Sequence, residues 1–225
     1  MPIVDLSDMD EIKLVRSAVL FRDMSNENFI KALSLFDAET ASYGKGDYLH
    51  SPFGKYKKFG LVISGTVQVC SDDIDGNRMI MAEVTPGITF GESICFLGIT
   101  DSPVYAFASE NVRVLWLSAD KLFEPGGDEL TVSLSKRFAS MLAARTLAMN
   151  DRIQVLSKIR LRDKLMTYFN QKSRDADSLT FRIPVNREDL AAYMGTDRSA
   201  LSRELSEMKK EGLIDYYKNS FRILK

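Results

Sequence analysis

The distribution of glycine divides this chain into two kinds of structure. Nine glycines lie between Gly44 and Gly98, whereas neither glycine nor proline occurs between Glu129 and Ser157. Glycine permits tight turns and weakens regular helices, so the first stretch favours short strands and the second an uninterrupted helix. The 225 residues are enough for two modest domains, and two is the expected number.

Residues 41–117 have the pattern of a compact β-barrel or roll. Short runs rich in Val, Ile, Phe and Tyr alternate with glycines, and Gly65, Gly76 and Gly87 are each 11 residues apart. The run from Leu61 to Val69 is interpreted as one strand that passes a glycine bend, and Asp75-Gly76-Asn77 as a hairpin turn. Residues 1–36 are predicted to form short helices, from the spacing of Ile12, Val15, Val19 and Leu20.

Residues 129–157 are predicted to form one long helix with an apolar stripe, because Leu130, Leu134, Phe138 and Met141 recur at three- and four-residue steps. Nearly thirty residues span about 40 Å, more than a domain of this size covers by itself. We therefore expect part of the stripe to contact a second copy of the chain in a coiled coil. The predicted dimer interface is Leu134, Phe138, Met141, Arg145, Ala148 and Arg152. The alternative is burial against the β-domain of the same chain.

The charge is unevenly distributed along the chain. Residues 1–157 contain 15 Lys and Arg against 21 Asp and Glu, a net charge of −6, and residues 158–225 contain 15 against 10, a net charge of +5. This asymmetry is expected when one domain contacts phosphate and the other does not. A solvated surface of mixed charge is the alternative interpretation.

Residues 181–225 have the pattern of a winged helix-turn-helix. Asn186 is placed to cap a first helix, Gly195 to form the turn after it, and Asp197 to cap a second helix that stops at Gly212. The buried faces are predicted to be Leu190, Ala191 and Met194 in the first helix and Leu201, Leu205 and Met208 in the second. A further helix is expected at 161–171, and two strands flanking Lys218-Asn219-Ser220 are expected to form a wing.

The second helix presents one polar face at its start. Two serines, Ser199 and Ser202, are three residues apart, and the pairs Arg198/Ser202 and Ser199/Arg203 are four residues apart. In a helix of 3.6 residues per turn these spacings place all four side chains on one outward side. Arginine donates two hydrogen bonds to guanine O6 and N7, and serine bonds to base or phosphate. These four residues are the predicted base contacts. A helical hairpin with ordinary surface charges is the alternative.

Several classes of protein are excluded or disfavoured. No apolar run reaches the ~18 residues of a membrane span, and the acidic N-terminal stretch lacks a signal-peptide core, so the prediction is a cytoplasmic protein without a membrane partner. His50 is the only histidine, and the sequence shows no metal-ligand spacing, phosphate-binding glycine loop or nucleophile constellation. We therefore expect neither an enzyme nor a metal site. Cys70 and Cys95 are interpreted as core residues.

The residues from Gly195 to Arg203 resemble the recognition helix of the Crp/Fnr transcription regulators. Upstream, Ile63-Ser64-Gly65-Thr66-Val67, Pro86-Gly87 and Phe90-Gly91-Glu92 resemble the glycine positions of the cyclic-nucleotide-binding-like β-roll of that family. The resemblance covers nearly the whole chain. It implies an α+β fold: a double-stranded β-helix or jelly-roll sensor domain at 1–128, a dimerisation helix at 129–157 and a winged helix-turn-helix at 158–225.

The resemblance implies a homodimer that binds a pseudo-palindromic operator on double-stranded DNA, with RNA polymerase as a further partner. It implies that Arg187 holds phosphate, and the full set of predicted backbone contacts is Asn186, Arg187, Thr196 and Lys218. Ser199 departs from the family pattern, in which Glu commonly contacts a cytosine, so no operator sequence is predicted. The alternative function is a sensory module whose C-terminal helices bind a protein instead of DNA.

The resemblance does not identify the effector that the sensor domain would bind. Thr100–Val104 has no arginine where cyclic-AMP receptors hold the cyclic phosphate, and Leu147-Ala148 replaces the residues that meet the base. Loss of such a contact costs roughly 1.5 to 3 kcal/mol, so cyclic AMP is disfavoured. Two cysteines disfavour an iron–sulfur cluster, and haem ligation by His50 is disfavoured as well. The predicted pocket for an unidentified small molecule is Phe90, Gly91, Glu92, Ser102, Tyr105 and Arg145, where Glu92 either lines the pocket or orients the turn.

Overall fold

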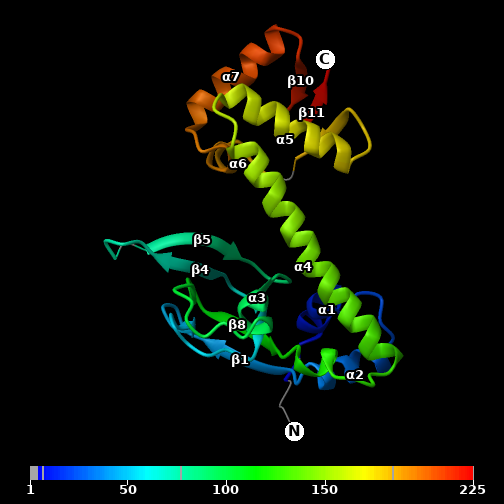
Figure 1. The fold of residues 1–225 in the computed structure, drawn as a ribbon. Helices are drawn as coiled ribbons and strands as arrows, with labels where there is room; N and C mark the ends of the chain where they lie inside the picture. The colour runs from blue at the N-terminus through cyan, green and yellow to red at the C-terminus, as the bar shows by residue number, and fades with distance from the viewer. Residues whose placement is uncertain (1–4, 7, 77, 184, 225) are drawn as a thin grey trace. The chain divides into compact units, whose positions relative to one another are not determined.

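The computed structural model describes residues 5–6, 8–76, 78–183 and 185–224. The chain forms two compact units, residues 1–142 and 143–225, and the boundary lies inside the long helix α4 (Glu129–Leu156) (Figure 1). The predicted domain limits at 128 and 157 stay predictions. The two units are described separately below.

Unit 1 contains two four-stranded sheets and several short helices. All described pairings between its strands are antiparallel, in the orders β1-β8-β3-β6 and β2-β7-β4-β5. The strands are β1 (Glu39–Tyr43), β2 (Tyr48–His50), β3 (Phe59–Ser64), β4 (Val67–Asp72), β5 (Arg78–Val84), β6 (Thr89–Phe90), β7 (Tyr105–Ala108) and β8 (Val112–Leu117). The helices are α1 (Met9–Ser17), α2 (Asn26–Leu35), α3 (Glu92–Phe96) and the 3-10 helix η1 (Asp120–Phe123).

The two sheets confirm the predicted β-structure, with one difference at Gly65. The run from Leu61 to Val69 is two strands, β3 and β4, because Gly65 has a φ of +75° and reverses the chain between them. The hairpin predicted around Gly76 is present between β4 and β5, where the Gly76 N–H donates to the Asp73 carbonyl at 3.0 Å. Asn77 lies outside the described residues.

Gly65 and Gly76 differ in what surrounds them, which gives a stability prediction. A Cβ at Gly65 would lie 2.2 Å from the Asn111 carbonyl oxygen, whereas a Cβ at Gly76 would meet nothing within 4 Å. Both have positive φ, so Gly76→Ala is expected to cost about 1 to 2 kcal/mol and Gly65→Ala about 1 to 3 kcal/mol more, because backbone must move. Urea unfolding of the two variants tests this, and equal midpoints would contradict it.

The core of unit 1 joins the sheets to the helices. Val15, Phe21 and Phe36 pack with Phe59 and Leu115 in one buried cluster. The first half of α4 belongs to this cluster: Leu134 and Phe138 are fully buried and Met141 is 9% exposed. Val19, predicted on the apolar face of an N-terminal helix, lies outside α1 and is 48% exposed.

This packing corrects part of the predicted dimer interface. Leu134, Phe138 and Met141 contact the core of their own unit and are not available to a second chain. The alternative that the sequence left open, burial against the β-domain, applies to these three residues. The sequence pattern does not separate the two alternatives, because an apolar stripe shows that a helix face is covered and does not show which surface covers it.

Unit 2 contains the second half of α4 followed by helices and a three-stranded sheet in the order β10-β11-β9. The helices are α5 (Leu161–Asp175), α6 (Arg187–Met194) and α7 (Arg198–Lys210), and the strands are β9 (Thr180–Arg182), β10 (Ile214–Tyr217) and β11 (Ser220–Ile223). The predicted helix at 161–171 is four residues longer than expected. Strand β9, which pairs with β11, was not predicted.

The core of unit 2 holds the three helices on the sheet. Fully buried Leu165 and Phe169 of α5 pack with Leu190 of α6 and Leu201 of α7. Phe221 of β11 completes the cluster, with its ring centroid 4.7 Å from that of Phe169. This core fixes α6 and α7 against each other and leaves their remaining faces exposed.

Candidate nucleic-acid interface

Side-chain caps define the two helices of the predicted helix-turn-helix. The Asn186 side chain accepts from the N–H groups of Glu188 and Asp189, and the Asp197 side chain accepts from the N–H of Ala200. Gly195 has a φ of +68° and closes the C-terminus of α6. Caps of this kind satisfy N–H groups that a helix leaves unpaired, so both helix starts confirm the sequence prediction.

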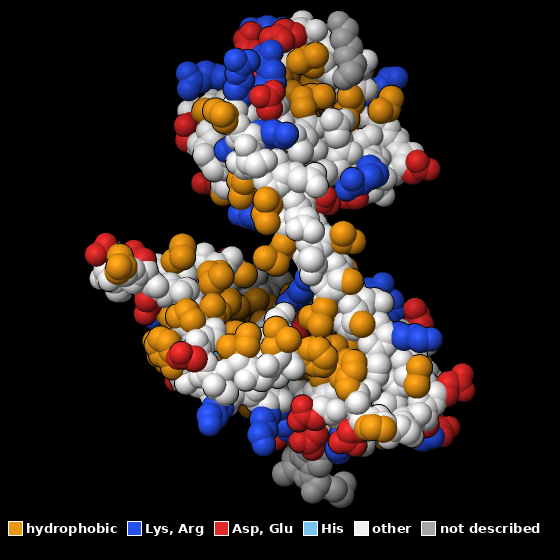
Figure 2. Space-filling view, viewed as in Figure 1, with side chains coloured by type: hydrophobic (Ala, Val, Ile, Leu, Met, Phe, Trp, Pro, Cys, Tyr) orange, Lys and Arg blue, Asp and Glu red, His pale blue; other side chains and the backbone are white. Residues whose placement is uncertain are grey.

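Helix α7 has one buried and one exposed face, as predicted. Leu201, Leu205 and Met208 are buried. The four predicted base contacts, Arg198, Ser199, Ser202 and Arg203, are all exposed. Figure 2 shows Lys and Arg side chains together with Asp and Glu side chains over α7.

The four side chains on the exposed face of α7 differ in whether they already make hydrogen bonds within the chain. The Ser199 hydroxyl donates to the Asp197 carboxylate, and the Ser202 hydroxyl donates to the Arg198 carbonyl at 2.8 Å. Within the described part of the chain, the structure gives neither Arg198 nor Arg203 a hydrogen bond or ion pair through its guanidinium group. Two unpaired guanidinium groups next to a helix N-terminus form a surface suited to an anionic, hydrogen-bonding ligand.

Two residues of α5 hold the helix-turn-helix in place, and the sequence analysis missed both. Arg162 donates to Glu204 at 2.7 Å and to both carboxylate oxygens of Glu211 at 2.7 and 2.8 Å, so it binds the middle of α7 and its C-cap residue. Lys164 donates to the Met194 carbonyl at the end of α6 at 2.9 Å. A lysine near a helix C-terminus is a typical cap, but its partner lies 30 residues away and no local pattern reveals it.

The wing is the β10–β11 hairpin. Ile214 pairs with Ile223 and Tyr217 with Ser220, so the predicted turn residue Ser220 begins the second strand. Lys218 adopts a φ of +52° in the turn and is exposed. Thr196, the fourth predicted backbone contact, is half-buried in the turn between α6 and α7, where its N–H donates to the Ala191 carbonyl.

Arg187 is held by the wing and is not free on the surface. Its guanidinium carbon lies 5.0 Å from the Tyr216 ring centroid and 4.9 Å from that of Phe221, and Nη2 donates to the Lys218 carbonyl at 2.9 Å. Burial lowers the pKa of this guanidinium below its usual value. Nη1 is buried without a hydrogen-bond partner. The predicted contact of Arg187 with phosphate is untested, and the structure assigns it a role within the domain.

Replacing Arg187 separates these two roles. We expect Arg187→Ala to lower the free energy of unfolding by about 1 to 2 kcal/mol, because the ring contacts and the bond to the wing turn are lost. Binding to all duplexes should weaken by a common factor. Urea unfolding and binding to two unrelated duplexes measure both effects, with Arg222→Ala on the exposed side of β11 as the control. Weaker DNA binding at unchanged stability would show that Arg187 contacts phosphate.

The predicted effector pocket is only partly assembled in unit 1. A cavity of about 50 Å³ is lined by His50, Val69, Phe90, Gly91, Ile94, Val104, Tyr105 and Ala106. Of the predicted residues, Phe90, Gly91 and Tyr105 line it and Ser102 does not. Glu92 is 2% exposed, and its carboxylate accepts a hydrogen bond from the Thr89 hydroxyl. Arg145 belongs to unit 2, and its place in the pocket stays a prediction.

Aromatic rings pack around His50, which lines both this cavity and a more open one of about 370 Å³ bordered by Tyr56 and Trp116. The His50 ring stacks on Tyr56 with centroids 3.8 Å apart and lies 5.0 Å from Trp116, and its Nε2 is 3.2 Å from the Lys58 carbonyl oxygen. Burial lowers the pKa of His50 to about 4. His50 also lies against Gly91, where an added Cβ would be 2.7 Å from the His50 Cε1. The imidazole is therefore a neutral packing group.

The cysteines and acidic residues show no metal site. Cys70 is buried, and burial raises the pKa of the half-buried Cys95 thiol to about 12. Among the residues that the structure describes, no three His, Cys, Asp or Glu side chains are placed to hold a metal ion. Across the same residues, no helix is both long and apolar enough to span a bilayer.

Comparison with known proteins matches both units. A family model described as a Crp-like helix-turn-helix domain matches residues 159–225, and one described as a cyclic nucleotide-binding domain matches residues 40–124. Two curated proteins of Thermus thermophilus are similar. The cyclic AMP receptor protein is 25% identical over 205 residues, 89% of each chain, and the transcriptional regulator SdrP is 24% identical over 182 residues, 78% of this chain and 85% of that protein.

Solved structures share the fold. The catabolite activator protein of Thermus thermophilus superposes with a TM-score of 0.51 at 23% identity, covering 92% of this chain and 93% of that one. DNR from Pseudomonas aeruginosa gives a TM-score of 0.51 at 19% identity and covers 100% of this chain and 96% of that one. The predicted arrangement of a β-roll, a long helix and a C-terminal helix-turn-helix is thereby confirmed.

Proposed function

Because the chain belongs to the Crp/Fnr family of DNA-binding transcription regulators, we propose that it binds a pseudo-palindromic operator as a homodimer, with one α7 in each half-site. The observation that carries this proposal is the exposed start of α7, where the guanidinium groups of Arg198 and Arg203 have no partner among the described residues and lie beside a capped helix N-terminus. Arginines in this position read guanine in the major groove. The proposed place of action is the cytoplasm, and RNA polymerase is the proposed partner at promoters.

Exposed apolar residues in the second half of α4 support the dimer. Met149, Ile153 and Leu156 are 65%, 60% and 42% exposed and follow each other at steps of four and three residues. This spacing places them on one side of the helix, in the pattern of a coiled-coil seam. They replace Leu134, Phe138 and Met141 in the proposed interface. Arg145 and Ala148 stay in it, whereas the Arg152 guanidinium stacks on Tyr193 of its own chain.

Two features of unit 1 argue against a cyclic nucleotide. The predicted pocket residues Phe90, Gly91 and Tyr105 line a cavity of only about 50 Å³, below the roughly 300 Å³ of typical ligand pockets, and a separate open cavity of about 370 Å³ lined by His50, Tyr56 and Trp116 contains none of them. The stretch Thr100–Val104 also offers no cation for a phosphate. We propose that unit 1 responds to a molecule other than a cyclic nucleotide. We propose no catalytic activity for the chain.

The experiment that tests the function is selection of DNA by the purified protein. Genomic fragments retained by the full chain are sequenced, with and without added pools of small metabolites. We expect an inverted repeat whose half-sites are about 34 to 36 Å apart, one helical turn. Retention of fragments without a shared motif would contradict the proposal. Capture of a protein that Arg198→Ala and Arg203→Ala do not disturb would favour the alternative sensory module.

A further inference from the structure

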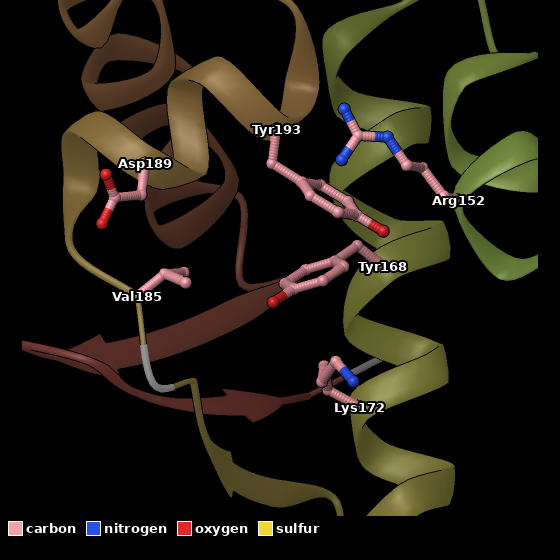
Figure 3. A pocket seen from close by; sticks show the side chains of 6 residues that line it. All are labelled: Arg152, Tyr168, Lys172, Val185, Asp189 and Tyr193. Atoms are coloured by element: carbon pink, nitrogen blue, oxygen red, sulfur yellow. The ribbon is translucent and has the colours of Figure 1, made fainter. Parts of the chain in front are cut away.

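A second cavity lies inside unit 2, between its helices. It has a volume of about 460 Å³ and is lined by Arg152 of α4, Tyr168 and Lys172 of α5, Val185, and Asp189 and Tyr193 of α6 (Figure 3). This volume is within the range of pockets that hold small organic ligands. The cavity is separate from the predicted effector residues of unit 1 and from the exposed face of α7.

Two tyrosine rings form the walls of this cavity. Their centroids are 5.2 Å apart and the planes are tilted by 50°. Tyr168 is only 6% exposed, and the structure gives its hydroxyl no hydrogen-bond partner among the described residues. Burial raises the pKa of both phenols, so both remain protonated donors at neutral pH. Figure 3 shows the Tyr168 hydroxyl directed toward the side of the cavity where Val185 lies. The hydroxyl oxygen is not sealed from solvent, so it is open to donate a hydrogen bond to a ligand in the cavity.

One cation lies over each of the two rings. The Arg152 guanidinium carbon is 4.8 Å from the Tyr193 ring centroid, and within the described residues it has no carboxylate partner. Lys172 Nζ lies 5.8 Å from the Tyr168 ring centroid and 2.8 Å from Asp175. Arginine stacked on an aromatic ring keeps its edge N–H groups free for a carboxylate. The walls therefore suit a planar ring, and Arg152 suits one negative charge attached to that ring.

We propose that this cavity binds a small aromatic carboxylate, with its ring packed against the edge of the Tyr168–Tyr193 pair and its carboxylate paired with Arg152. A hydroxyl or amino substituent would meet Asp189 or the Tyr168 hydroxyl. Such a ligand contacts α4, α5 and α6 at once. Since α6 packs against α7, a bound ligand would change the position of the recognition helix; this regulatory step rests on the proposed function, whereas the binding site does not.

Calorimetric titration of the full chain tests the site directly. Benzoate, salicylate and indole-3-carboxylate are the probes, with benzamide as the uncharged control. We expect saturable binding of at least one carboxylate with a dissociation constant on the order of 0.1 to 1 mM, and at least tenfold weaker binding of benzamide. Absence of saturable binding by all three carboxylates at about ten times that concentration would overturn the proposal.

Variants identify the residues involved. Arg152→Gln is expected to weaken carboxylate binding roughly tenfold and to reduce the preference over benzamide. Tyr168→Phe keeps the ring and should weaken salicylate more than benzoate. Arg160→Gln, exposed in the same unit and outside the cavity, is the matched control and should bind as the parent does. Equal affinity of Arg152→Gln, Tyr168→Phe and the parent would place the ligand elsewhere and contradict the proposal.

The regulatory step is measured separately. The affinity of the selected operator is compared with and without saturating salicylate, and light scattering follows the dimer. A change in operator affinity that Arg152→Gln abolishes supports regulation through this cavity. If the protein binds carboxylates but selects no operator, the binding site is supported and the proposed function is contradicted. If it selects an operator but binds no carboxylate, the proposed function is supported and the binding site is contradicted.

Discussion

Alanine at Arg203 is expected to lower operator affinity by about 1 to 3 kcal/mol, roughly five- to 150-fold, and to relax the preference at one base position in each half-site. Both arginines of the α7 face are exposed and held by no partner in the described chain, so their loss removes contacts with DNA and leaves the buried face of α7 unchanged. Arg198→Ala should lower operator affinity by a similar amount and relax the preference at a different base position. The double variant should retain only sequence-independent binding.

Electrophoretic shifts with a panel of operators mutated one base pair at a time measure these effects. Lys210→Ala is the matched control, because Lys210 is a 72% exposed cation at the other end of α7, paired with Glu207. We expect it to bind the panel as the parent does. If Arg203→Ala lost affinity equally for every member of the panel, the residue would contact phosphate and the assignment of base readout would be wrong.

Glutamate at Ile153 is expected to dissociate the dimer and to reduce operator affinity by a factor on the order of 10² to 10⁴. Two copies of Ile153 would meet, or lie near each other, in the proposed seam, so the substitution buries two like charges without partners. A dimer binds its second half-site as an intramolecular step, and a monomer loses this advantage. Sedimentation and operator titration measure the two effects.

Leu147→Glu provides the matched control for the dimer. Leu147 is a 65% exposed apolar residue of α4 on the side of the helix away from Ile153. The same change of charge there should leave the dimer intact. A dimer that survives Ile153→Glu and dissociates with Leu147→Glu would place the interface on the other face of α4.

The helix-turn-helix could be predicted from sequence because its determinants are local. Asn186 and Asp197 cap N–H groups two or three residues away, and Gly195 adopts its positive φ where the chain turns. The apolar positions Leu201, Leu205 and Met208 follow the helical period. Such features depend on neighbours in the sequence, and the structure confirms them.

The features that sequence reasoning missed depend on distant partners. The stacking of Arg187 on Tyr216 and Phe221 joins residues about thirty positions apart. Strand β9 exists because it pairs with β11, and Arg162 is occupied by carboxylates of α7. A sequence pattern states which residue types are available, and the tertiary contacts decide which group each one meets.

The apolar period of the long helix α4 also fails to reveal which surface covers it. Its apolar residues recur from Leu130 to Leu156, yet Leu134 and Phe138 are buried in their own unit while Met149 and Ile153 are exposed. The periodicity is identical in both halves. The contacts that Leu134 and Phe138 make within unit 1 distinguish the two halves, and the periodicity does not.

The packing of His50 between Tyr56 and Trp116 has a consequence for acid–base control. It is the only imidazole in the chain, and its pKa near 4 keeps it uncharged throughout the physiological range. Both thiols lie in unit 1 with raised pKa values, and residues 143–225 contain neither histidine nor cysteine. The side chains that most often sense protons or oxidants are thus absent from the half of the protein that carries the recognition helix. Operator occupancy should stay constant as the cell drifts from mildly acidic to mildly alkaline.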